Sequence, residues 1–118
     1  AELIRCPQLP TTLPTLDELL GSGGLNAANV AAHLLELTRV PPATGHVYTL
    51  HAELEGGKLI PVFEALLCGW KEQGYELVSM RSLAESLDLK NLPRNEIALG
   101  SLAGRSGTLA QQGREFLA

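Results

Sequence analysis

Helix-like and strand-like patterns alternate along the middle of the chain, and this order limits the choice of fold more than any other property of the sequence. Apolar residues recur at three- and four-residue spacing over residues 26–41 and 61–74, and a further helix is predicted over 82–87. Short β-rich runs follow the first two segments, at 46–51 and 75–78. Such alternation is typical of α/β folds with parallel strands, so the sequence predicts this class.

The size of the chain limits how much of such a fold it can form. Its 118 residues are enough for one hydrophobic core and too few for two. Two or three parallel strands cannot close a barrel, so residues 1–118 are predicted to be part of one larger α/β domain. The absence of Met or a leader at Ala1 is interpreted as a cut end. Residues 88–118 lose the periodicity, and we expect an irregular tail with a strand at 97–99 as its one exception.

Capping residues mark the expected starts of the helices. Thr15 is suited to cap a short helix, with Glu18 three residues later as its capping-box partner. Asn26 is the predicted cap of the next helix, and Ser82 that of the last. Pro61 suits the first turn of the helix between them, because the missing N–H is not needed there.

Composition and charge exclude several classes of protein. The chain is 45% hydrophobic and 19% charged, which excludes a disordered chain and a coiled coil. No apolar run approaches the roughly 18 to 20 residues that cross a bilayer. The formal net charge is −4, and no run of Lys and Arg is present. Nucleic acid is therefore not an expected partner.

Cysteines and two of the histidines give no sign of a metal or disulfide site. Cys6 and Cys68 lie too far apart in sequence for a disulfide framework or a metal clip, and Cys68 is predicted to be a core residue within a helix. His33 and His46 have no partner at metal-ligand spacing. We interpret both histidines as structural or surface residues.

His51 is the candidate catalytic residue. It ends the predicted strand at 46–51, and catalytic groups of α/β folds gather at the carboxyl ends of strands. An imidazole gains and loses a proton near neutral pH, so His51 is suited to act as a general acid toward a leaving amine. The alternative is a strand-end histidine that only hydrogen-bonds backbone carbonyls.

Two glutamates follow His51 at alternate positions. On an extended backbone, Glu53 and Glu55 would point to the same side as His51. Two roles are open for them, either orienting the imidazole or forming a solvated loop edge.

Three blocks of sequence together resemble the C-terminal part of deformylases in the NodB-type polysaccharide deacetylase family. The similarity covers most of the chain, and the blocks occur in the same order. They are Leu13-Pro14-Thr15-Leu16-Asp17-Glu18, the run Val-Tyr-Thr-Leu-His-Ala-Glu-Leu-Glu-Gly at 47–56, and Gly104-Arg105-Ser106-Gly107.

The resemblance implies a fold and an activity. The fold would be a distorted (β/α) barrel, of which this chain holds only the C-terminal strands and helices. The activity would be hydrolysis of the formamide on an undecaprenyl phosphate-linked amino sugar with the help of a divalent metal (Zn, Co or Mn), in lipid A modification and polymyxin resistance. The family's Leu-His general acid falls on Leu50-His51. Glu53, Glu55 and Arg105 are further candidates for substrate binding. Arg105 lies in the third block and could meet a substrate phosphate, but the favoured interpretation is an ordinary surface arginine.

The family's metal ligands have no counterpart in this chain. Its paired aspartates and two histidines belong to the N-terminal part of the barrel, so this chain is expected to contribute no metal ligand and to be inactive alone. A part without its missing half is expected to self-associate through exposed apolar surface. The expected location is the cytoplasm, peripheral to the bacterial inner membrane. The alternative function is a non-catalytic interaction or structural α/β domain.

Overall fold

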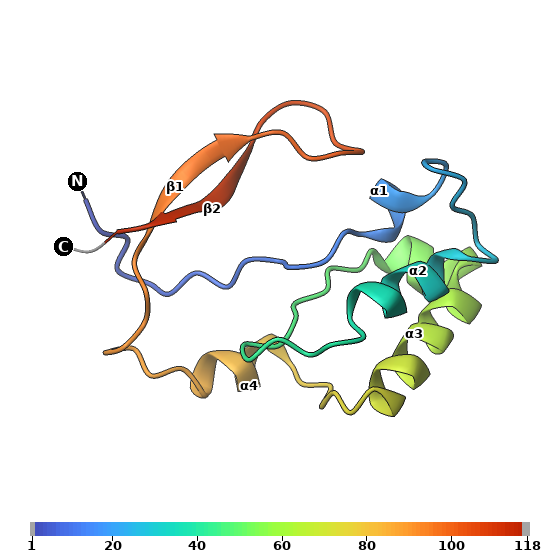
Figure 1. Ribbon diagram of the computed structural model, residues 1–118, viewed down its shortest axis with the longest axis horizontal. Helices are drawn as coiled ribbons and strands as arrows, with labels where there is room; N and C mark the ends of the chain where they lie inside the picture. Colours follow the sequence, from blue (N-terminus) through green and yellow to red (C-terminus); the bar gives the residue numbers. More distant parts are fainter. Residues whose placement is uncertain (1, 117–118) are drawn as a thin grey trace. The chain divides into compact units, whose positions relative to one another are not determined.

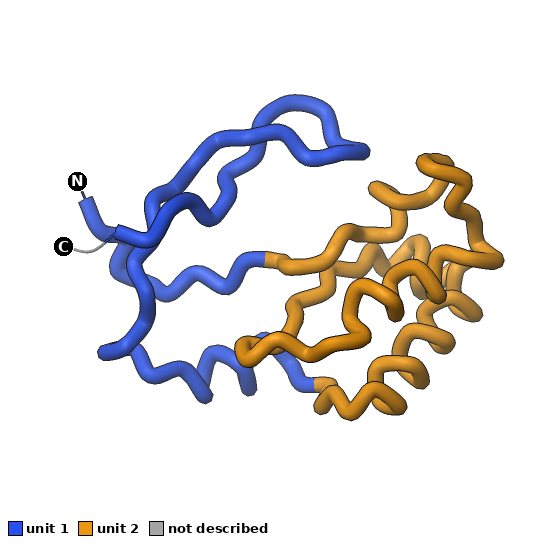
Figure 2. Tube along the Cα trace, in the orientation of Figure 1, with its two compact units in different colours: residues 1–10, 78–118 blue, residues 11–77 orange. Residues whose placement is uncertain are grey.

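The computed structural model describes residues 2–116, which fall into two compact units (Figure 2). Unit 2 is continuous and comprises residues 11–77. Unit 1 combines residues 1–10 with 78–118, apart from the terminal residues that lie outside the described part. The candidate general acid and all eight buried apolar side chains of the described residues belong to unit 2.

Unit 2 is a small helical unit with one hydrophobic core. Its elements are α1 (Leu16–Leu19), α2 (Val30–Leu37), the π-helical turn η1 (Leu54–Lys58) and α3 (Ile60–Glu72) (Figure 1). Helices α2 and α3 pack together, and η1 leads directly into α3. The core consists of Leu13, Leu16, Val30, Leu34, Leu59, Val62, Leu66 and Trp70.

Local signals set the helix ends. The capping box of α1 is confirmed, because the Thr15 N–H donates to Glu18 Oε1 at 2.8 Å. Helix α3 carries its proline in the first turn, as predicted. Helix α2 begins at Val30, so the predicted start at Asn26 was wrong. Asn26 instead forms a turn, in which its Oδ1 accepts the N–H of Ala28 at 2.8 Å.

The two predicted parallel strands of the middle region are not strands. Residues 46–51 and 75–78 are extended but pair in no sheet among the described residues. Residues 46–51 instead contact residues 11–12 of the same unit, where the Thr12 N–H donates to Val47 O at 2.9 Å and Thr12 Oγ1 accepts the Val47 N–H at 2.9 Å. The α/β class is confirmed only as a mixture of helices with a small sheet, and the deacetylase barrel stays a prediction.

Unit 1 contains helix α4 (Met80–Glu85) and an antiparallel pair of strands. Strands β1 (Asn95–Gly100) and β2 (Leu109–Glu115) pair from Asn95 opposite Glu115 to Gly100 opposite Leu109, with an irregularity between Asn95 and Ile97. The predicted strand at 97–99 lies within β1, whereas the expectation of an otherwise irregular tail missed β2. The cap of α4 lies three residues earlier than predicted, at Ser79 instead of Ser82, and the Ser79 hydroxyl oxygen accepts the Ser82 N–H at 3.1 Å.

The surface corrects one further expectation. Cys68 is exposed on α3 and is not a core residue, because Val62, Leu66 and Trp70 form the buried face of that helix.

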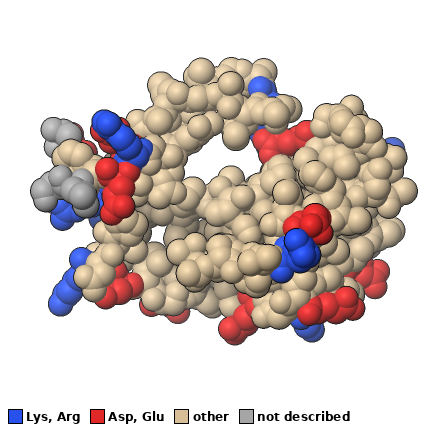
Figure 3. All heavy atoms as spheres, in the orientation of Figure 1, with Lys and Arg blue, Asp and Glu red and all other residues tan. Residues whose placement is uncertain are grey.

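On the face drawn in Figure 3, most of the surface is uncharged, and basic side chains are interspersed with acidic ones. Within residues 2–116, no helix is both long and apolar enough to cross a bilayer.

Candidate functional site

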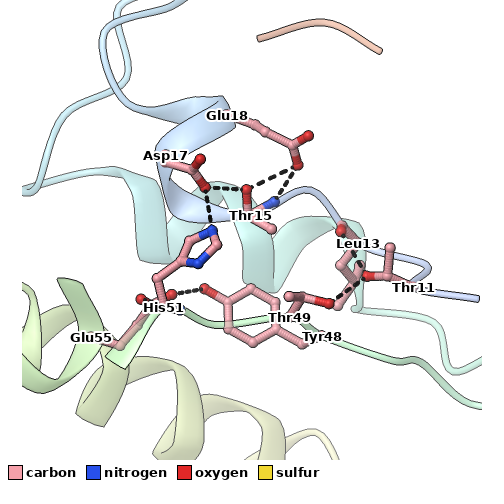
Figure 4. Close-up of polar contacts among 9 residues, drawn as sticks. All are labelled: Thr11, Leu13, Thr15, Asp17, Glu18, Tyr48, Thr49, His51 and Glu55. Carbon is pink, nitrogen blue, oxygen red and sulfur yellow. Dashed lines mark hydrogen bonds and ion pairs between the residues drawn. The ribbon is translucent and has the colours of Figure 1, made fainter. Parts of the chain in front are cut away.

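His51 lies where the extended segment of unit 2 turns into a helical turn. Its carbonyl oxygen accepts the N–H groups of Leu54 and Glu55 at 2.9 and 3.0 Å, so the chain bends immediately after it. The imidazole points toward α1, where its Nε2 lies 3.2 Å from Oδ1 of Asp17 (Figure 4). A third of the His51 side chain is exposed. The ring is thus partly open to solvent and paired with a carboxylate.

Asp17 is held in place by the residues that cap α1. The Thr15 hydroxyl donates to Asp17 Oδ1, the same oxygen that faces His51. Thr15 is itself buried and fixed through its N–H to Glu18. The same hydroxyl also lies 3.0 Å from Glu18 Oε1, so it bridges the two carboxylates at the start of the helix. The capping box therefore both starts the helix and orients the carboxylate toward the imidazole.

The Nε2 atom of His51 has an unusual position for a polar atom. It is buried and makes no hydrogen bond with the part of the chain that the structure describes, although Asp17 Oδ1 is at ion-pair distance. The two findings agree if the atoms are close without the alignment that a hydrogen bond requires. The exposed third of the side chain consequently consists of atoms other than Nε2. One nitrogen thus faces the carboxylate, and the solvent-facing part of the ring lies elsewhere.

Glu55 holds the backbone of His51 from a buried position. Only 1% of Glu55 is exposed. Its Oε2 accepts the His51 N–H at 3.0 Å, and its Oε1 accepts the Tyr48 hydroxyl at 2.8 Å (Figure 4). Burial of the phenol, followed by the hydrogen bond and the negative charge of Glu55, raises the pKa of Tyr48 far above its usual range. Tyr48 also packs edge-on against Trp70, with ring centroids 5.2 Å apart.

The other predicted site residues lie in different surroundings. The expectation that Glu53 and Glu55 share the side of His51 was wrong, because the backbone becomes helical at residue 52 and ends the strand-like alternation. Glu53 is exposed whereas Glu55 is buried. Arg105 is an exposed residue of unit 1 in the loop between β1 and β2, where its N–H donates to Leu102 O at 3.1 Å.

The described residues do not fit a metal ion. Over residues 2–116, no group of three or more His, Cys, Asp or Glu side chains converges on one point. His51 and Asp17 supply two donors, whereas a catalytic zinc-type site uses about three protein ligands. His46 Nδ1 is instead 2.9 Å from the Thr12 hydroxyl, and His33 is exposed on α2. The site's own chemistry is that of an imidazole beside a carboxylate.

Two curated relatives confirm the resemblance to deformylases. A protein of Shewanella sediminis is 39% identical over 111 residues, which are 94% of this chain and 35% of the relative. A protein of Wigglesworthia glossinidia brevipalpis is 30% identical over 105 residues, which are 89% of this chain and 36% of the relative. Both carry the name "Probable 4-deoxy-4-formamido-L-arabinose-phosphoundecaprenol deformylase ArnD". The chain spans about a third of the length of these relatives. No protein-family model and no solved structure matches it.

Proposed function

We propose that this chain, a homologue of deformylases named ArnD over nine-tenths of its length, supplies the general acid of a formamide hydrolase, and that His51 is that acid. The observation that carries the proposal is the placement of the His51 ring against Asp17, 34 positions earlier in the chain. An imidazole that is partly exposed and also faces a fixed carboxylate can take up a proton and deliver it. A histidine that only satisfies backbone carbonyls would not need this partner.

The chemistry requires a proton at the nitrogen of the amide. Water adds to the formyl carbon of a formamide, and the C–N bond then breaks as its electron pair moves to nitrogen. The amine is a poor leaving group unless that nitrogen receives a proton, which general acid catalysis provides. His51 delivers this proton from Nδ1, the nitrogen that does not face Asp17. Asp17 keeps the ring in its orientation and balances its positive charge before the transfer.

The substrate contacts follow from the same homology. The substrate is an undecaprenyl phosphate-linked 4-formamido-arabinose, matching the class of molecule in the names of the relatives. Arg105 is suited to meet the phosphate with a bidentate contact, and Glu53 to accept hydrogen bonds from sugar hydroxyls. Glu55 was expected to share this role, but its burial keeps it from contacting a substrate.

The rest of the reaction belongs to residues outside this chain. The groups that activate water, including ligands for a divalent metal such as Zn, Co or Mn, would lie in the portion of the relatives that this chain does not match. The chain alone is then inactive. The complete protein would work in the cytoplasm at the surface of the inner membrane, in lipid A modification and polymyxin resistance.

The experiment is formate release by the full-length gene product. His51→Ala should lower turnover by about 10² to 10⁴, the range typical of losing a general acid. Asp17→Asn should cause a smaller loss, because the ring remains. Glu64→Gln is the matched control, since Glu64 is an exposed residue of α3. Unchanged turnover in His51→Ala would refute the role of His51. A full-length product that never releases formate would instead favour a non-catalytic interaction or structural domain.

A further inference from the structure

Glu55 is the one buried ionisable residue among those that the structure describes, and no step of the proposed reaction uses it. A buried carboxylate is costly to maintain unless hydrogen bonds replace its lost water. Both oxygens of Glu55 accept such bonds, from the Tyr48 hydroxyl at 2.8 Å and from the His51 N–H at 3.0 Å. The Glu55 carboxylate therefore holds the His51 backbone and the Tyr48 hydroxyl through hydrogen bonds.

These contacts connect His51 to the core of unit 2. Glu55 lies in η1, and Tyr48 lies in the extended segment that leads to His51. The Tyr48 ring packs against Trp70 of α3. Trp70 is in turn anchored by a hydrogen bond of 3.1 Å from its Nε1 to the Thr38 hydroxyl. We call Tyr48, Glu55 and the His51 N–H the Glu55 clamp.

We propose that Glu55 is a positioning residue for His51, acting through the His51 backbone rather than through the substrate. This inference rests on the proposed function of His51. Asp17 constrains the ring, and Glu55 constrains the main chain from the other side of the residue (Figure 4). A general acid must sit within hydrogen-bond reach of the leaving nitrogen, and a misplacement of about 1 Å can cost about a hundredfold in rate. Fixing both ends of the residue meets that requirement.

Two substitutions of Glu55 in the full-length gene product test the proposal. Glu55→Ala removes both acceptors and frees the His51 N–H, so kcat should fall by about a hundredfold while KM stays within about twofold. Glu55→Gln keeps the shape. Its carbonyl oxygen can accept the His51 N–H, and its amide can donate to the Tyr48 oxygen, so it should restore kcat to within a few fold of the wild type. A folded Glu55→Ala variant with wild-type kcat would overturn the proposal.

A matched pair of tyrosine variants covers the case in which Glu55→Ala does not fold. Tyr48→Phe removes the hydroxyl that donates to Glu55, whereas Tyr75→Phe removes a similar hydroxyl that donates to Thr38 O at 2.6 Å. Both lose one partly buried hydrogen bond, but only Tyr48 is joined to Glu55. Tyr48→Phe should lower kcat several fold, and Tyr75→Phe should leave it unchanged. Equal effects of the two variants on kcat would show that the clamp is merely structural.

An NMR readout separates this proposal from the proposed function. The imidazole ¹⁵N signals of His51 should shift or broaden in Glu55→Ala, while those of His33 and His46 stay where they are. This holds whether or not the protein turns over substrate. Unchanged His51 signals would overturn the positioning role. A wild-type protein without deformylase activity, but with the expected His51 response, would overturn only the proposed function.

Discussion

Replacing Thr38 with valine should weaken the helical core that supports the candidate site. Thr38 is fully buried at the end of α2. Its hydroxyl accepts the Trp70 Nε1–H at 3.1 Å, and its shortest acceptor is Gln73 Oε1 at 2.8 Å. Valine has nearly the same shape but can neither accept nor donate. The substitution therefore leaves one donor and one acceptor without their protein partner.

The size of the effect follows from the surroundings of the two groups. Trp70 is 6% exposed, so its stranded N–H should cost about 1–3 kcal/mol. Gln73 is only half-buried, so water can replace part of its lost hydrogen bond. The extra buried methyl group of valine returns about 0.8 kcal/mol. Together these terms leave a net loss of about 1–2 kcal/mol in the free energy of unfolding.

Urea unfolding followed by tryptophan fluorescence measures this loss. Trp70 is the single tryptophan of the chain, so the signal reports the residue that loses its partner. The midpoint should fall while the slope with urea stays constant. Thr108→Val is the matched control, because Thr108 is exposed in the loop between the strands of unit 1. A loss below about 0.5 kcal/mol, within the range of ordinary surface substitutions, would refute the reasoning.

Two further predictions concern alkaline pH and self-association. Because the folded protein raises the pKa of Tyr48 above its ordinary value of 10.0, the folded state keeps a proton that the unfolded state releases at high pH. Its stabilising effect is complete below about pH 10 and is lost as the pH rises further, so urea midpoints should fall there in the wild type and less in Tyr48→Phe. Ile97 and Leu99 are 62% and 75% exposed on β1, so the chain alone should elute from a sizing column above its 12.6 kDa monomer, and increasingly so with concentration. A monomer at all concentrations would contradict this expectation.

The predictable parts of the fold are those that neighbouring residues determine. Thr15 and Glu18 form their capping box within one turn, and Pro61 fixes the first turn of α3, so both helices could be predicted. The start of α2 was harder, because Asn26 and Asn29 are both good caps and only the structure shows that the first forms a turn. The neighbouring residues alone do not show which of these two asparagines caps the helix.

The strands were mispredicted because strand formation depends on a partner. Residues 46–51 have strand-forming composition and are extended, but no neighbouring strand is present among the described residues to complete a sheet. The opposite error occurred in unit 1. Strand β2 contains Gln111, Gln112 and Gly113 and lacks an apolar alternation, yet it pairs with β1 through backbone hydrogen bonds. Backbone pairing of this kind leaves little trace in side-chain patterns.

The candidate site was predictable only in part. His51 could be identified from its place at the end of the extended segment and from the resemblance. Asp17 could not be paired with it from local patterns, because a contact over 34 positions depends on the whole of unit 2. The burial of Glu55 was missed because it depends on the helical bend that begins at residue 52.

The brevity of α1 has a consequence for how the protein would respond to heat. A helix of four residues is far too short to persist alone, so the position of Asp17 depends on the cap and on the buried Leu16. Fraying of this single turn would release the carboxylate from the imidazole while α2 and α3 remained packed. Warming would then separate Asp17 from His51 at a lower temperature than the one at which α2 and α3 unfold.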